Sequence, residues 1–212
     1  MNMPLDETIP KFTPEEYARF FELKKSGLEL ILGPMHAMVG HAIIAFQVGG
    51  PVDMYRFLQP SHGTAFATME LIEPDGTGPM PSRIGVFELI AFTKHAIDES
   101  DPHNGFSEAE LRIRRIFTRV ARSAFYEPFH PLDTCEVPQS DGQPNICVVF
   151  GEWRKRGTPF KIGANKFGLL LCIEVFQKEM EFAMQEGTKE LIKRVKEKGY
   201  YPFSDLEREP VV

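Results

Sequence analysis

The 212-residue sequence lacks the features that mark several large classes of protein. No run approaches the roughly 18 apolar residues of a membrane-spanning helix, and the first residues have neither the basic start nor the apolar core of a signal peptide. We therefore expect a cytoplasmic protein with no membrane partner. No internal repeat is visible, so we expect one domain over residues 13–199, between an irregular segment (1–12) and a C-terminal tail (200–212).

Cysteine is scarce and basic charge is not in excess. Cys135, Cys147 and Cys172 are odd in number and widely spaced, which argues against a disulfide. The formal net charge is −6, and an acidic protein is a poor partner for nucleic acid because phosphates attract basic surfaces. We expect no nucleic-acid partner, and these features identify no activity.

Common catalytic and metal motifs are also missing. The sequence has no Gly-x-Ser-x-Gly and no Cys-x-x-Cys, and Gly76–Gly78 lacks the context of a dinucleotide fold. His36 and His41 are five residues apart, about 140° of rotation on a helix, whereas two ligands on one face need a spacing of three or four. We expect no metal and no cofactor.

Three acidic residues, Asp53, Glu88 and Glu174, fall in predicted strands. Carboxylates held close together in a sheet can have raised pKa values and act as general acids or bases. Charged side chains are rarely buried, so we expect these three to face outward. A small hydrolase-like enzyme that uses clustered carboxylates and histidines remains an alternative hypothesis.

The strongest structural signal is a continuous apolar run, Phe167–Ile173, which predicts a strand buried on both faces. Helical spacing follows it, and Gly187 should end that helix because glycine reaches left-handed dihedrals easily. Thr188 is expected to cap a second helix that ends at Gly199.

Upstream, a capping box of Thr13, Pro14 and Glu16 predicts a helix that runs past Gly27 to Gly33. Alternating and apolar segments then predict two hairpins. The first joins residues 42–48 to residues 52–58, and the second joins residues 64–72 to residues 84–92. Residues 126–138 look irregular and residues 146–150 predict another strand. Strands and helices mix without regular alternation, so we expect an α+β fold, a mixed, largely antiparallel sheet with helices packed on it.

A helix after Ser107, with Glu110 completing a capping box, has the clearest periodicity in the chain. One of its faces is apolar. The other carries a row of arginines: Arg112, Arg115, Arg119 and Arg122. Such a row can bind a carboxylate-rich or phosphorylated partner through bidentate hydrogen bonds. The alternative is a solvated face with ion pairs to nearby acids.

Several strings, in order, resemble the suppressor-of-fused domain over most of the chain from about Ala42 onward. The resemblance rests on Val52–Tyr55, on His62 with Phe66 and Glu70–Leu71, on Phe87–Ile90, on Phe129–Val137, on Phe167–Gly187 and on Asp205–Arg208. It implies a non-enzymatic protein-binding module. Animal members of the family capture an extended peptide of Gli transcription factors as an added strand between two domains. We expect the second domain to be absent here, so Gli binding is not carried over.

The resemblance extends to bacterial single-domain members, some of which are placed in toxin and immunity gene neighbourhoods. It therefore implies a second alternative, an immunity protein whose acidic surface masks a basic toxin. In either case we expect the partner to be a protein or an extended peptide. An open sheet edge would capture such a peptide through unpaired backbone amides. A candidate edge strand runs from His62 through Thr64 and Phe66 to Ile72. Together with the arginine row, these residues are the expected partner-binding positions.

Overall fold

A computed structural model describes residues 11–40, 42–59, 63–139, 142–155 and 157–212. Its helices are α1 (Pro14–Leu32), α2 (Gly105–Ala124), α3 (Gln177–Glu186) and α4 (Thr188–Glu197), with a short 3-10 helix, η1 (Phe46–Val48). Its strands are β1 (Met35–Gly40), β2 (Met54–Leu58), β3 (Thr64–Ala67), β4 (Phe87–Thr93), β5 (Thr134–Val137), β6 (Ile146–Glu152), β7 (Lys161–Ile162), β8 (Asn165–Lys166) and β9 (Gly168–Val175). None of the helices in these ranges is long and apolar enough to cross a membrane.

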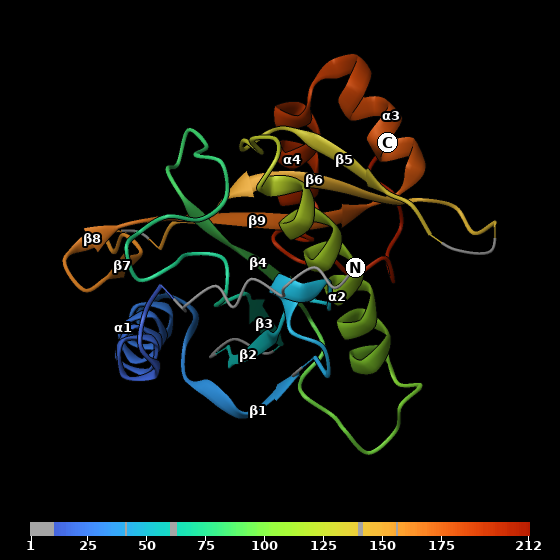
Figure 1. The fold of residues 1–212 in the computed structure, drawn as a ribbon. Helices are drawn as coiled ribbons and strands as arrows, with labels where there is room; N and C mark the ends of the chain where they lie inside the picture. The colour runs from blue at the N-terminus through green and yellow to red at the C-terminus, as the bar shows by residue number, and fades with distance from the viewer. Residues whose placement is uncertain (1–10, 41, 60–62, 140–141, 156) are drawn as a thin grey trace, which may run out of the picture.

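The centre of the molecule is a seven-stranded sheet in the order β1-β2-β3-β4-β9-β6-β5, and β7 and β8 form a separate ladder (Figure 1). Among the strand pairs of this sheet, β4 and β9 run parallel and the others antiparallel. The predicted α+β class with a mixed, largely antiparallel sheet is therefore confirmed.

Strand β9 lies in the interior of the sheet, between β4 and β6, and all eight of its residues are buried. This confirms the interpretation of the apolar run. Helix α3 ends at Gly187, whose φ of 97° lies in the region that favours glycine. The predicted Thr188 cap is wrong: Gly187 is the N-cap of α4, and Thr188 is buried in its first turn.

Helices cover both faces of the sheet, which gives three layers. Helix α2 packs on one face with the predicted apolar stripe, which consists of Ile113, Ile116, Phe117, Val120, Ala121 and Ala124, all buried. Helices α1, α3 and α4 pack on the opposite face around a second apolar cluster. The sheet is thus buried on both sides, and its inner strands β2, β3, β4, β6 and β9 contribute side chains to both cores.

The N-terminal helix follows its sequence signals. Thr13 and Glu16 form the predicted capping box, with the Glu16 amide 3.2 Å from the Thr13 hydroxyl. Gly27 lies in the middle of α1 because β7 passes there. A Cβ on Gly27 would be 2.0 Å from the carbonyl oxygen of Lys161, so any other residue would push this ladder away.

The first hairpin differs from its prediction. The antiparallel partner of β2 is β1, which the sequence left unassigned, and residues 42–48 contain η1 instead of a strand. Gly49, with a φ of 100°, ends η1 by donating its N–H to the Phe46 carbonyl. Ile43 and Val48 are highly exposed, so the apolar composition of this segment does not reflect burial in the core.

The second hairpin, β3 with β4, is confirmed, but β3 ends at Ala67 and not at Ile72. The cause is Glu88 on β4, which is fully buried and accepts hydrogen bonds from the Leu71 and Ile72 amides at 3.3 and 3.1 Å. These bonds fold residues 68–72 into a turn. The expectation that Glu88 faces outward is therefore wrong.

Lys24 of α1 neutralises Glu88 and also binds the backbone of this turn. Its Nζ lies 2.6 Å from Glu88 Oε1 and 2.8 Å from the carbonyl oxygens of both Met69 and Ile72. Its side chain is 1% exposed. The ion pair satisfies two buried charges and ties a helix, a turn and a strand together.

Two further predictions need correction. Helix α2 begins at Gly105, two residues before Ser107, because Asn104 caps it by accepting the Ser107 amide at 2.8 Å. Within residues 126–138, which looked irregular, residues 134–137 form β5 against β6. Both features depend on partners distant from the local pattern.

The C-terminal residues pack back onto the domain. Arg208 forms a buried ion pair with Glu179 of α3 at 2.7 Å, and the Val211 amide donates to the same carboxylate at 2.9 Å. Burial alone would raise the pKa of Glu179, but the bonds from Arg208, Val211 and Phe176 outweigh it and hold this pKa below its usual value. The ionised form of Glu179 therefore stabilises the fold.

Replacing Lys24 with methionine should lower the free energy of unfolding by about 3 to 5 kcal/mol, because it leaves the Glu88 carboxylate buried without its cation. Urea denaturation measures this change. The matched control, Lys193→Met on the exposed face of α4, should stay within about 0.5 kcal/mol. Adding Glu88→Gln to Lys24→Met should recover part of the loss, and equal costs for the two lysine variants would contradict the assignment.

Glu179→Gln should change the acid sensitivity of the fold. Since the folded pKa of Glu179 lies below its unfolded value, its contribution is full above about pH 4.5 and is lost as pH falls through the folded pKa. The variant should be less stable at pH 7 and lose less stability on acidification. Thermal unfolding at pH 7 and pH 3 tests this, with exposed Glu186→Gln on the same helix as the control; parallel losses in both variants would refute it.

Candidate functional site

The arginine row of α2 divides into two parts. Arg112 pairs with Glu174 of β9 in a bidentate arrangement, with its Nε 2.9 Å from Glu174 Oε2 and its Nη2 bonded to the other oxygen. The Glu174 side chain is 2% exposed, so the expectation that it faces outward is also wrong. Burial raises the pKa of Glu174, and the hydrogen bonds from Arg112 oppose this change. Arg112 is therefore an internal counter-ion of the sheet.

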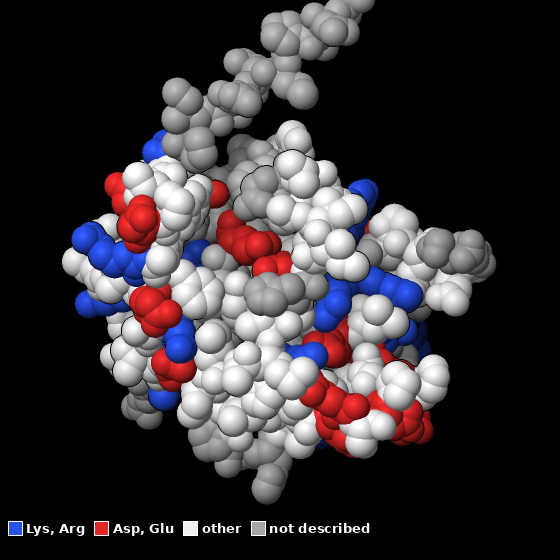
Figure 2. Space-filling model, turned by 60° about the horizontal axis from the view of Figure 1, so that its bottom comes forward, with Lys and Arg blue, Asp and Glu red and all other residues white. Residues whose placement is uncertain are grey.

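The other three arginines line a groove of about 680 Å³ between α2 and the end of β5. Its walls combine basic, amide and apolar side chains. They are Pro51, Leu111, Arg114, Arg115, Thr118, Arg119, Arg122, Val137, Pro138, Gln139, Gln143 and Ile146, and none of these is acidic. Basic side chains gather at the right of the face drawn in Figure 2. We call the hollow lined by these twelve residues the arginine groove.

The arginines of the groove are held mainly by neutral partners. Arg115 donates to the side chain of Gln139 at 3.1 Å, and Arg122 donates to the carbonyls of Gly49 and Gly50. Arg119 takes part in none of the hydrogen bonds or ion pairs found among the described residues. The groove therefore keeps most of its positive charge.

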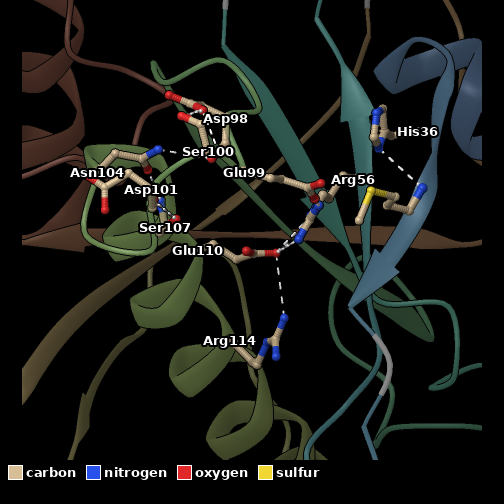
Figure 3. Close-up of polar contacts among 11 residues, drawn as sticks. His36, Arg56, Asp98, Glu99, Ser100, Asp101, Asn104, Ser107, Glu110 and Arg114 are labelled. Carbon is tan, nitrogen blue, oxygen red and sulfur yellow. Dashed lines mark hydrogen bonds and ion pairs between the residues drawn. The ribbon is translucent and has the colours of Figure 1, made fainter.

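Arg114, which the sequence reasoning missed, also lines the groove, and it shares the carboxylate of Glu110 with Arg56 of β2. Arg56 bonds Glu110 of α2 at 2.9 Å and also pairs with Glu99, as Figure 3 shows. Arg114 reaches the same Glu110 at 3.6 Å. One carboxylate thus serves two guanidiniums. The Nε of Arg114 and the hydroxyl of Thr118 are buried with no hydrogen-bond partner in the described part of the chain.

The open edges of the sheet are β1 and β5. Strand β3 pairs with β2 on one side and β4 on the other, and its Thr64 and Phe66 are fully buried. The hypothesis that this strand is an open edge is therefore wrong, and His62 lies outside the described residues. β1 has an irregular register with β2, whereas β5 is regularly paired with β6 along its length.

Strand β5 has a hollow at each end. Val137 and Pro138 at its C-terminal end belong to the wall of the arginine groove. A second hollow, of about 450 Å³, lies at its N-terminal end and is lined by Phe129 and Thr134 together with Met184 of α3. The free edge of β5 therefore connects two concave regions of the surface.

The three candidate acids, Asp53, Glu88 and Glu174, do not form one cluster. Glu88 faces the side of the sheet covered by α1, Glu174 faces α2, and Asp53 accepts the Ala42 amide at 2.8 Å before β2 begins. Among the described residues, no three His, Cys, Asp or Glu side chains are placed to hold a metal ion. His41 lies outside this set. The three cysteines are free thiols, and burial raises the pKa of Cys172 well above its usual value.

Comparison with solved structures identifies the fold. A suppressor-of-fused (SUFU) homologue from Neisseria gonorrhoeae matches with a TM-score of 0.56 and 12% identity, over 92% of this chain and 98% of that chain. The Sufu-Fu complex crystal structure matches with a TM-score of 0.61 and 10% identity, over 90% and 91%. The chain has a SUFU-like fold. No protein-family profile and no curated protein matches the sequence.

Arg112→Met and Arg115→Met should separate the two parts of the arginine row. Removing Arg112 leaves the buried carboxylate of Glu174 without its cation, and the free energy of unfolding should fall by about 1 to 3 kcal/mol. Arg115 has one exposed neutral partner, so its loss should cost less than about 0.5 kcal/mol. Urea denaturation measures both, and a larger cost for Arg115 would contradict the division.

Proposed function

We propose that this protein is a binding module and not an enzyme, and that it captures an extended protein segment along the free edge of β5. The observation that carries the proposal is the continuity of this edge with the arginine groove, since Val137 belongs to both. The edge supplies backbone hydrogen bonds, which bind any extended chain. The groove supplies selectivity for acidic or phosphorylated side chains.

The spacing of the arginines suits a strand as occupant. Side chains on one face of a strand repeat every two residues, about 6.8 Å, and neighbouring turns of α2 are about 5.4 Å apart. An extended segment with acidic residues at alternate positions would therefore place its carboxylates within reach of Arg115 and Arg119. The partially satisfied Arg115 and the unpaired Arg119 would gain charge-assisted hydrogen bonds without breaking an existing ion pair.

Two further observations support binding over catalysis. Solved structures with the same fold include one described as a Sufu-Fu complex, so a protein partner is known for that neighbour. Two of the three strand carboxylates that the hydrolase alternative would use, Glu88 and Glu174, are held in ion pairs on opposite faces of the sheet. Glu88 and Glu174 are therefore not available as a shared acid and base for the hydrolase alternative.

A display library of unstructured peptides tests the proposal directly. Selection on the purified protein should enrich acidic-x-acidic sequences, and their affinity should fall with rising salt because exposed charges are screened. Arg115→Glu/Arg119→Glu should weaken binding of a selected peptide at least tenfold in calorimetry. The matched control is Lys189→Glu/Lys193→Glu on α4, which changes the charge equally and should have no more than a twofold effect.

Two results would overturn the proposal. One is a selection that returns no acidic preference. The other is equal loss of affinity in the arginine and lysine double variants, because that would show a general charge effect. A selected peptide that carries N-methyl groups on alternate amides tests the contribution of the β5 edge: it should lose affinity if the peptide adds as a strand.

A further inference from the structure

A different hollow lies on the other side of the sheet from the arginine groove, between α1 and the turn that follows β3. It measures about 350 Å³ and is lined by Tyr17, Ala18, Phe20, Phe21, Lys24, Tyr55, Met69, Glu70, Ile72 and Glu73. Four of these side chains are aromatic and two are acidic. In Figure 2, acidic side chains lie sunk in a hollow near the middle of the face. We call the hollow of about 350 Å³ between α1 and this turn the aromatic pocket.

The charge of the aromatic pocket is negative. Glu70 accepts the Asp53 amide at 3.0 Å and Glu73 accepts the Tyr17 hydroxyl at 3.1 Å, and neither takes part in an ion pair among the described residues. Lys24 in the wall bonds directly to Glu88 and two carbonyl oxygens, and it acts on Glu70 through its charge alone. Among the described residues, the two carboxylates therefore have no directly bonded cation.

The pKa shifts of Glu70 and Tyr55 agree with this negative charge. Burial is the main cause that raises the pKa of Glu70, and the charges of Asp53 and Glu88 add to it, against the hydrogen bond from the Asp53 amide and the charge of Lys24. Burial and the same carboxylates, with Glu70, raise the pKa of Tyr55. A cation placed in the pocket would relieve this repulsion.

The rings are arranged to receive such a cation. Phe21 and Tyr55 pack with centroids 5.6 Å apart and planes tilted by 54°. The Lys24 ammonium lies 5.0 Å from the Phe20 centroid, so one ring of this wall already contacts a positive charge. The negative face of an aromatic ring attracts cations, most strongly where water is excluded.

We propose that the aromatic pocket binds an organic cation with N–H donors, the ammonium or guanidinium group of a basic side chain or of a small amine. The aromatic walls hold the alkyl chain and the charge, and Glu70 and Glu73 accept its hydrogen bonds. A divalent metal ion fits poorly, since Ca²⁺ takes six to eight oxygen ligands and two carboxylates supply too few. The volume corresponds to roughly twelve waters, enough for one lysine or arginine side chain.

This site is separate from the β5 edge, so the two proposals fail independently. NMR titration of the full chain with N-acetyl-lysine methylamide and N-acetyl-arginine methylamide tests it. At least one should bind with a Kd on the order of 1 mM and shift the ring signals of Tyr17, Phe20, Phe21 and Tyr55. The neutral isostere N-acetyl-norleucine methylamide should bind at least fivefold more weakly.

Variants assign the effect to the pocket. Glu70→Gln and Glu73→Gln should each weaken binding of the cation at least fivefold, whereas Glu190→Gln on α4 should leave it unchanged. Unchanged ring signals in the free variants verify that the pocket keeps its fold, and both variants should bind an acidic peptide like the unmodified chain. Tyr17→Leu, at the exposed rim, provides a variant that keeps both carboxylates and should also weaken binding.

The source of the cation is distinguished by a second pair of probes. n-Butylammonium and a short unstructured peptide with a central lysine carry the same group. Tighter binding of the peptide assigns the pocket to a basic protein partner, and equal affinity assigns it to a free amine. Equal binding of the neutral isostere, or full affinity in the Glu70→Gln/Glu73→Gln double variant, would overturn the proposal.

Discussion

The buried ion pair between Lys24 and Glu88 is the interaction on which the rest of the fold depends. Glu88 lies on β4, the fourth of the seven strands of the sheet, and its carboxylate organises the turn after β3. Lys24 brings α1 onto that turn. A charge buried here would be costly alone, and the pair is tolerated because every oxygen and nitrogen has a partner. The same contact shapes one wall of the aromatic pocket.

Two more ion pairs repeat this arrangement elsewhere in the SUFU-like fold. Arg112 of α2 neutralises Glu174 on the opposite face of the sheet, and Arg208 neutralises Glu179 where the C-terminal residues return to α3. Each pair joins a helix or the C-terminal segment to an element distant in sequence. Carboxylates that could have formed a reactive cluster are therefore used to hold the layers together.

The charges that remain outside these pairs form two surface regions of opposite sign. Arg115 and Arg119 face a groove that contains no acidic lining residue, whereas Glu70 and Glu73 face an aromatic pocket whose lysine is already paired. The protein therefore has a local basic site although its net charge is −6. Regions of opposite charge on one small domain can orient a partner that carries both kinds of side chain.

The sequence by itself determined the elements whose signals are local. The run through β9, the glycine that ends α3, the capping box of α1 and the apolar stripe of α2 depend on period and on neighbouring residues, and all appear as predicted. The SUFU-like arrangement could be proposed from the order of such strings. For the site, the sequence indicated the arginine row as a candidate surface.

Only the tertiary structure decided which strands are edges and which charges are free. Arg112 and Arg115 look alike in sequence, but Arg112 meets Glu174, 62 residues away, and Arg115 does not. Glu88 looked like an outward-facing strand residue until Lys24, 64 residues away, became its partner. Pairing between distant charges and the order of strands in a sheet are non-local, so no local pattern specifies them.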